Sequence, residues 1–265
     1  MINAQIIADS VNIETGDRLT TFVLLRFPKC LVAELNTHRQ LSRNSESSRA
    51  IPVKKRIEKI NKDPYIPSFT LNQKGMIGAE IDLESKEIAE SYWFAAMGSA
   101  ISNAEWLSNS GIHKDMANRL LEPFSRVPVI VSATEWDNFF KLRTASDCNP
   151  DFRQVAIAMQ ELRNQSKPRE LDLGEWHIPY DFDSCHLEDR LGVSAARCAR
   201  ISYSTHDGEF SPRKDILLCD RLIREGHLSP LEHQAKAIHS IDSVNTHNLK
   251  GFQSYRALVE LGEMT

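Results

Sequence analysis

Long apolar runs, a secretory start and paired cysteines are absent from this 265-residue sequence. No apolar run approaches the roughly 20 residues that a membrane helix needs. The first 18 residues lack the basic start and apolar stretch of a secretory signal. The five cysteines are scattered without a C-x-x-C pair, which argues against a zinc ribbon or a disulfide framework. We therefore expect a cytoplasmic protein with no membrane partner and no metal site.

Two common nucleotide-binding motifs are also missing. Neither G-x-G-x-x-G nor G-x-x-x-x-G-K-[ST] occurs, so a nucleotide would have to be held by something other than a Rossmann turn or a P-loop. The net charge of −4 indicates that the surface as a whole is not built to attract nucleic acid.

Apolar spacing predicts a mixture of strands and helices. β-branched and aromatic residues favour strands at residues 3–9, 19–27 and 127–134. Helical periodicity predicts a long amphipathic helix over 83–108 and further helices over 113–121, 135–145, 150–165, 193–203 and 213–226. Residues 40–52 and 166–187 are polar or broken by prolines, and we interpret them as loops.

The charge balance is locally reversed between residues 37 and 56, where six Lys or Arg stand against one acid, Glu46. Serines and an asparagine lie between these cations. Arginine binds phosphate through a planar fork, and serine hydroxyls add short hydrogen bonds. The window indicates an anion site, although composition alone also allows a solvated polar loop.

The order of these residues resembles the signature of the flavin-dependent thymidylate synthases, R-H-R-x-x-S-x-N-x-x-S-x-R-Y. Residues 37–50 read THRQLSRNSESSRA. The matches in register are His38, Arg39, Ser42, Asn44, Ser47 and Arg49. Thr37 and Ala50 depart from the family pattern, at the leading Arg and the final Tyr.

A second resemblance lies near the other end of the chain. Residues 226–233, GHLSPLEH, are similar to the family block G-H-x-[ST]-P-x-E-H, and Ala199-Arg200-Ile201-Ser202 is similar to its A-R-x-S segment. On their own, the two histidines of the block would be read as a capped helix end with a buried His. Their spacing matches no known zinc site.

A third resemblance concerns two arginines. Arg119 and the segment from Asn138 to Arg143 correspond to family positions that bind the nucleotide and the flavin, with Arg126 as a competitor for the place of Arg119. A surface salt bridge on a helix is the plainer alternative for Arg119.

The order of the motifs is unusual, since the family places the histidine block before the signature. A circular permutation is the simplest explanation. The resemblance then implies a single domain over residues 1–265 of the α/β (α+β) class, mainly helical, with a central antiparallel sheet. The tail from residue 248 has no clear counterpart.

The family resemblance also implies a chemistry. The family methylates dUMP to dTMP with methylenetetrahydrofolate, FAD and NADPH, as a homotetramer with shared sites and without a cysteine nucleophile. Arg143 is the expected catalytic residue, stabilising charge on the pyrimidine. Ser47, Arg49, Arg119 and Arg143 are expected to bind the substrate, and His38, Arg39, Asn138, Ser202, His227 and Ser229 the flavin.

Three alternatives remain open at this stage. The same scaffold can install hydroxymethyl in place of methyl, and the departures at Thr37 and Ala50 favour keeping that reading. A nucleotide or RNA binder without flavin would show a steep salt dependence. A homologue that has lost turnover would bind flavin without oxidising NADPH.

Overall fold

Two sheets organise the protein in the computed structural model, which describes residues 4–74, 77–203, 211–239 and 247–264 except the side chains of Ser202 and Tyr203. The larger sheet has strand order β3-β4-β2-β1-β5, and the smaller has order β6-β7-β8. The strands are β1 (Ala4–Asn12), β2 (Arg18–Pro28), β3 (Ser42–Ser45), β4 (Arg126–Ala133), β5 (Arg169–Leu171), β6 (Trp176–His177), β7 (Ala235–Ala237) and β8 (Phe252–Ser254). Every neighbouring pair is antiparallel except β1 with β5, so the predicted mixed class with an antiparallel sheet is confirmed.

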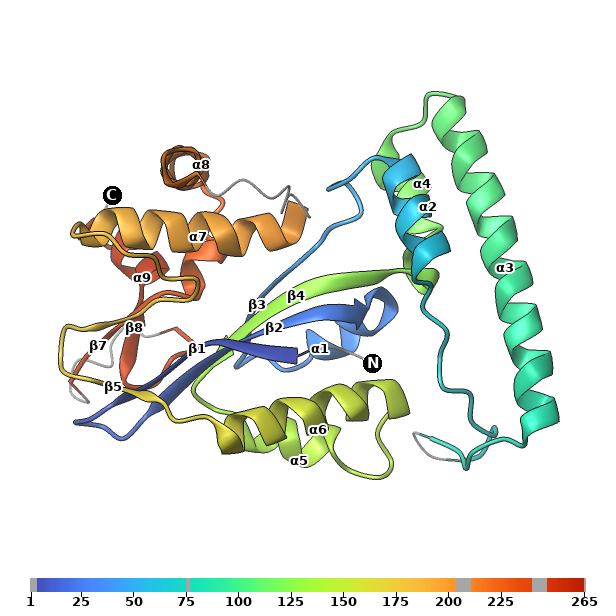
Figure 1. The fold of residues 1–265 in the computed structure, drawn as a ribbon, viewed down its shortest axis with the longest axis horizontal. Helices are drawn as coiled ribbons and strands as arrows, with labels where there is room; N and C mark the ends of the chain where they lie inside the picture. The colour runs from blue at the N-terminus through green and yellow to red at the C-terminus, as the bar shows by residue number, and fades with distance from the viewer. Residues whose placement is uncertain (1–3, 75–76, 204–210, 240–246, 265) are drawn as a thin grey trace.

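Helices surround the larger sheet (Figure 1). They are α1 (Val32–Leu35), α2 (Val53–Lys62), α3 (Leu83–Asn109), α4 (Lys114–Arg119), α5 (Asp137–Arg143), α6 (Pro150–Gln165), α7 (Leu187–Tyr203), α8 (Pro212–Arg224) and α9 (Tyr255–Glu260). Short 3-10 turns are η1 (Lys29–Leu31), η2 (Glu122–Phe124) and η3 (Ser229–Glu232). None of the helices in the described residues has both the length and the apolar character that crossing a bilayer requires.

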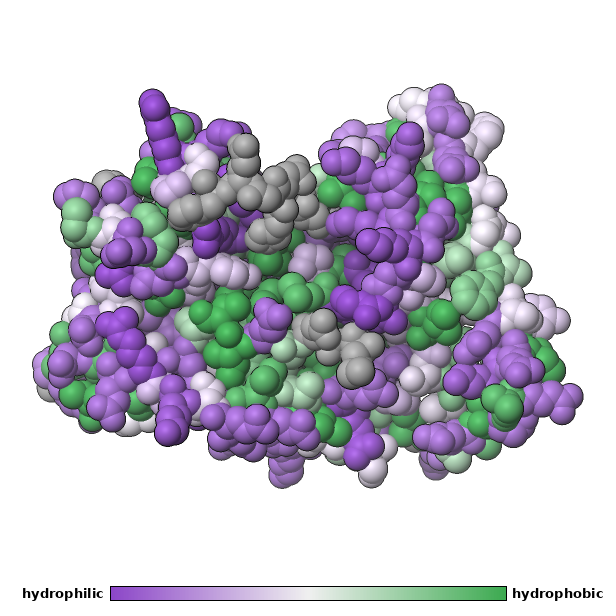
Figure 2. Space-filling view, viewed as in Figure 1, coloured by the Kyte–Doolittle hydropathy of each residue, from purple (hydrophilic) through white to green (hydrophobic). Residues whose placement is uncertain are grey.

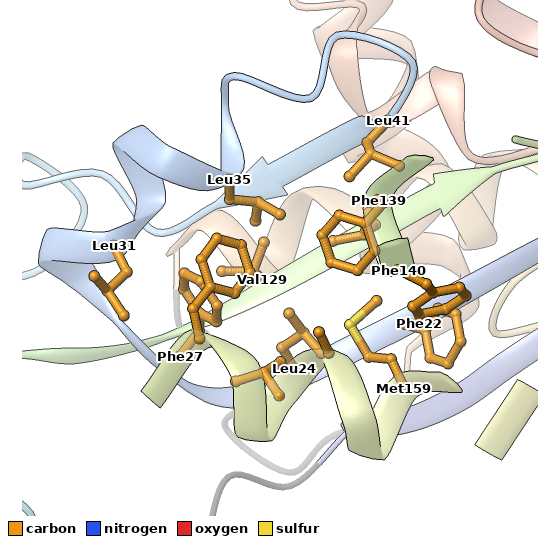
Figure 3. Packing of buried hydrophobic residues seen from close by; sticks show 14 of the residues in the cluster. Phe22, Leu24, Phe27, Leu31, Leu35, Leu41, Val129, Phe139, Phe140 and Met159 are labelled. Carbon is orange, nitrogen blue, oxygen red and sulfur yellow. The ribbon is translucent and has the colours of Figure 1, made fainter. Parts of the chain in front are cut away.

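The main core lies between one face of the larger sheet and helices α5 and α6. Phe22 and Leu24 of β2 and Val129 of β4 meet Phe139 and Met159 from these helices (Figure 3). The opposite face, which carries Val23 and Ile130, packs on α7. Because both faces are covered, β2 is buried without interruption over residues 19–24.

Helices α2, α3 and α4 form an arm beside the sheet, on the right of Figure 1. Asp82 caps α3 by accepting a 2.8 Å hydrogen bond from the Ser85 N–H, which fixes where the helix begins. Trp93, Met97 and Ile101 face the arm's own small core. The other side of the arm leaves large apolar residues in solvent, namely Leu83, Ile88, Tyr92, Phe94 and Trp106 on α3 and Met116 on α4. Figure 2 shows the surface hollowed between this arm and the α7–α8 layer.

Two segments that we predicted as loops contain strands. Residues 40–52 include β3, which pairs with β4 in the register Asn44↔Ile130. Residues 166–187 include β5 and β6, with Trp176 and His177 buried. Both predictions were wrong for one reason. Asn44 of β3 and His177 of β6 are buried polar residues that bond to partners distant in sequence, which an apolar pattern does not reveal.

The end of α8 turns the chain toward the histidine block. Gly226 has φ 74°, a conformation that favours glycine, and its N–H and that of His227 bond back to the carbonyls of Ile223 and Leu222. The tail beyond residue 248 then packs against the block, because β8 pairs with β7 and Arg256 bonds Glu232 at 2.6 Å.

Candidate functional site

Two clefts border strand β3 and share Arg43, Ser45 and Ser229 as a common wall. The first, which we call the arginine cleft, has a volume of about 470 Å³ and is lined by Arg43, Asn44, Ser45, Ser47, Arg49, Ala199, Leu222, His227, Ser229 and Pro230. The second, which we call the mixed cleft, has a volume of about 510 Å³ and is lined by Val32, Leu35, Asn36, Arg39, Leu41, Arg43, Ser45, Val129, Ser229, Glu232 and Asn248. Both volumes are in the range of small-molecule sites.

The arginine cleft contains two cations and no acid among its lining residues. Arg43 is held in place by hydrogen bonds to the side chain and carbonyl of Asn36, at 2.6 and 3.1 Å. Arg49 is exposed and has no ion-pair partner within the described residues. A positive, hydroxyl-rich cleft of this kind suits a phosphate-bearing ligand.

The signature segment (residues 42–49) and the histidine block (residues 226–233) meet at this wall, although they lie at opposite ends of the chain. Asn44 and Ser229 Oγ are hydrogen bonded at 3.0 Å, and Asn44 is 3.2 Å from His233 Nε2. The structure therefore unites the two motifs. Circular permutation itself stays a prediction.

The buried acid Glu46 holds the signature segment in place through its ion pairs. Glu46 is fully buried and pairs with Arg56 at 2.6 Å and Lys59 at 3.1 Å, while Lys29 donates to its carbonyl at 2.5 Å. Arg56 also donates to the Ser47 carbonyl at 3.3 Å. These bonds fix the backbone from which Ser47 and Arg49 reach the cleft.

His38, near the start of the signature, contacts Arg143 at the end of α5. Arg143 Nε donates to His38 Nε2 at 2.8 Å, and the guanidinium lies over the Phe152 ring at 4.5 Å. Burial, together with the charges of Arg143 and Arg43, lowers the pKa of His38 to about 4, so its ring is neutral and accepts this bond. Thr37, which replaces the family Arg, accepts from Arg143 Nη2 at 3.3 Å.

The remaining predicted residues are spread more widely. Arg39 lines the mixed cleft, and Ser47, Arg49 and His227 line the arginine cleft. Arg143 lines neither of them, and exposed Asn138 does not either.

Two further predicted residues lie outside these linings. Arg119 lies on α4, with its guanidinium 3.7 Å from Asp115 of the same helix. The side chain of Ser202 lies outside the described residues. Arg126, the competitor for the place of Arg119, instead lies over the Tyr65 ring beside Asp63.

Sequence reasoning missed Arg43 and Ser45, which line both clefts, and the part played by His233. The signal that could have found the first two is the alternation of a strand over residues 42–45.

Neither a thiolate nor a metal cluster is built at this site. Cys148 is buried away from both clefts, and burial raises the pKa of its thiol. In the part of the chain that the structure describes, no group of three or more His, Cys, Asp or Glu is placed to hold a metal ion.

The family model described as thymidylate synthase complementing protein matches residues 19–169. The match covers more than half of the chain. This protein belongs to that family. The matched region contains the signature, Arg119, Asn138 and Arg143 but stops before the histidine block. The predicted resemblance is thus confirmed.

Comparison with solved structures adds two similar chains. Both are the UMP/dUMP methylase PolB from Streptomyces cacaoi, one bound with 5-Br UMP and one with 5-Br dUMP. The first is 17% identical with a TM-score of 0.48, covering 61% of this chain and 88% of that one. The second is 17% identical with a TM-score of 0.46, covering 61% and 89%. A search of curated proteins gave no match.

Proposed function

We propose that this protein is a flavin-dependent thymidylate synthase that methylates dUMP to dTMP with methylenetetrahydrofolate, FAD and NADPH, without a cysteine nucleophile. The observation that carries the proposal is the arginine cleft, an acid-free pocket built by the signature of a thymidylate synthase family.

The nucleotide phosphate fits the arginine cleft. Arg49 has no internal ion pair to give up, and Ser45 and Ser47 supply hydroxyl donors beside it. By family resemblance Arg119 of α4 also binds the nucleotide, and α4 is joined to the signature because Asn118 donates to the carbonyls of Ser48 and Ile51 at 2.7 and 2.9 Å. Each charged hydrogen bond to phosphate contributes about 1.5–3 kcal/mol.

We assign the flavin to the mixed cleft. Val32, Leu35, Leu41 and Val129 give an apolar surface for a flat ring, and Arg39 provides a cation for the diphosphate. By family resemblance His38, Asn138, Ser202, His227 and Ser229 also contact the flavin, and of these Ser229 lines the mixed cleft of the single chain. When bound and reduced by NADPH, the flavin supplies hydride.

Arg143 is the proposed catalytic group, because a fixed guanidinium beside a pyrimidine stabilises negative charge without a proton transfer. Its bond to neutral His38 and its stacking on Phe152 hold it rigidly. Since it lines neither cleft of the single chain, we propose that a second copy completes the site. A homotetramer accounts for the exposed apolar residues of α3, such as Ile88, Tyr92 and Trp106.

The deciding experiment combines a spectrum with a product assay. Purified protein with FAD is expected to show a bound-flavin band that NADPH bleaches and dUMP perturbs. With methylenetetrahydrofolate, mass spectrometry should then find dTMP. A hydroxymethyl product would replace this proposal with the sister reaction, and absence of flavin binding would overturn the cofactor assignment.

A further inference from the structure

A line of hydrogen bonds links buried side chains across the larger sheet and ends at the wall between the two clefts. It links Ser10 to His177 at 2.9 Å, His177 to Thr21 at 2.8 Å, Thr21 to Ser132 at 2.6 Å, and Ser132 to His233 at 2.8 Å. His233 then contacts Asn44 at 3.2 Å, and Asn44 contacts Ser229 at 3.0 Å. We call these seven residues the polar line.

Six of its members are buried, and only Ser229 is exposed. Burial lowers the pKa of both His177 and His233 to about 3, so the two rings are neutral at physiological pH. A neutral imidazole has one N–H donor and one acceptor nitrogen, and a hydroxyl has one O–H donor and two acceptor lone pairs. Within the described residues, the side chains of Thr21 and Ser132 bond only to each other and to the two imidazoles, and a buried O–H without an acceptor is costly, so each of these hydroxyls donates to one neighbour in the line and accepts from the other. The whole line therefore runs in one of two senses.

The backbone around Asn44 selects the sense. One end of its amide lies 3.1 Å from the Arg43 carbonyl oxygen and 3.2 Å from the Ser229 carbonyl oxygen. Carbonyl oxygens only accept, so this end is the NH₂ group, whose two N–H bonds are shared among these two carbonyls and His233 Nε2 at 3.2 Å. A protonated Nε2 would point its N–H at another donor, so Nε2 is the unprotonated nitrogen of His233. The amide oxygen then accepts from Ser229 Oγ at 3.0 Å.

The remaining protons follow by necessity. His233 Nε2 is an acceptor, so Nδ1 carries the proton and donates to Ser132. Ser132 donates to Thr21, and Thr21 donates to His177 Nε2. His177 is therefore also protonated on Nδ1 and donates to Ser10.

We propose that the polar line fixes both buried histidines as Nδ1–H tautomers and thereby commits the Ser229 proton to Asn44. Ser229 then presents a lone pair to the clefts and accepts a hydrogen bond from the ligand. The group it selects is a donor, such as a lactam N–H of a flavin or pyrimidine ring. This ligand assignment rests on the proposed function, whereas the tautomers do not.

An acceptor group in that place would either take the Ser229 proton and leave the Asn44 oxygen without its donor, or reverse the line. Reversal changes more bonds. Asn44 would lose its bonds to two carbonyls, and both imidazoles would have to move their protons. His233 is thus a positioning residue, since it lines neither cleft and acts on the ligand through Asn44 and Ser229.

The tautomers can be measured without any ligand. In ¹⁵N-labelled protein, long-range ¹H–¹⁵N correlation spectra distinguish Nδ1–H from Nε2–H rings, and the variants His177→Gln and His233→Gln assign the two signals. We expect Nδ1–H for both. An Nε2–H ring at either position, or a charged ring at pH 7, would overturn the proposal.

A matched pair of variants tests the effect on binding. Ser132→Ala removes the acceptor of His233 Nδ1–H, whereas Ser125→Ala removes an equally buried hydroxyl that bonds only the Leu121 carbonyl. Ser132→Ala should weaken FAD or dUMP binding about tenfold, the value of roughly one hydrogen bond. Ser125→Ala should not, and Ser132→Thr should restore binding.

Equal affinities in Ser132→Ala and Ser125→Ala would disprove the coupling to Ser229. If the unmodified protein bound neither FAD nor dUMP, the proposed function and the ligand assignment would both be refuted. The spectra would still decide the tautomers.

Discussion

The signature segment from Ser42 to Arg49 has two sides with different tasks. On the inner side, Ser42, Asn44, Glu46 and Ser48 are 4%, 9%, 0% and 5% exposed. On the outer side, Arg43, Ser45, Ser47 and Arg49 line the clefts. The burial alternates with the period of a strand, although β3 itself ends at Ser45.

The difference teaches that identity with a family motif does not define one role. The matched residues Ser42 and Asn44 belong to the inner side, and Asn44 transmits the position of His233 to Ser229. The matched Ser47 and Arg49 belong to the outer side and face the proposed ligand. Substitutions on the inner side should change stability first, and those on the outer side should change affinity first.

The largest effect is expected from Glu46→Gln on the inner side. Removing one partner of a buried ion pair leaves Arg56 uncompensated, which typically costs about 3–5 kcal/mol of unfolding free energy. Urea denaturation measures it, with the exposed Glu58→Gln of α2 as the matched control. Equal stabilities of the two variants would show that the buried pair does not hold the segment.

A second, smaller effect is a pH dependence of stability, and it comes from the two buried histidines of the polar line, of which His233 contacts Asn44 on the inner side. His177 and His233 have folded pKa values of about 3, against 6.5 for a free histidine. Between those values the unfolded chain binds more protons, so stability is full above pH 6.5 and falls as the pH decreases toward 3. Each histidine should remove on the order of 2 kcal/mol between pH 7 and pH 5.

Denaturation curves at these two pH values provide the measurement. His227→Gln should leave the loss of stability unchanged, because His227 is exposed and lies outside the polar line. A fold equally stable at both pH values would contradict the burial of two neutral histidines.

The sequence predicted the elements whose stability comes from their own apolar pattern. Strands β1, β2 and β4 and helices α3, α6 and α8 lie close to where periodicity placed them. Strands β3 and β6 were not predicted, because Asn44 and His177 are buried through hydrogen bonds to residues that are 185 and 156 positions away in the sequence, respectively. A local pattern carries no information about such partners.

The candidate site divides in the same way. The resemblance to the family motifs selected Ser47, Arg49, His227 and Ser229, and all four line the arginine cleft. The placement of Arg143 could not be predicted, since a long side chain pairs with whatever the fold brings near it. In the single chain its partners include His38 and Glu34.

The smallest expected effect in free energy concerns the outer side and tests its function directly. Arg49→Ala should weaken dUMP binding by about 1.5–3 kcal/mol, or roughly 10–150-fold, because one charged contact to phosphate is lost. Its unfolding free energy should change by no more than about 0.5 kcal/mol, since Arg49 is exposed. Isothermal titration with dUMP checks the affinity, and the exposed Arg221→Ala on α8 controls for the loss of a positive charge. If Arg49→Ala destabilised the protein as much as Glu46→Gln while keeping full affinity, the division between inner and outer sides would fail, because the outer residue would then serve the fold and not the ligand.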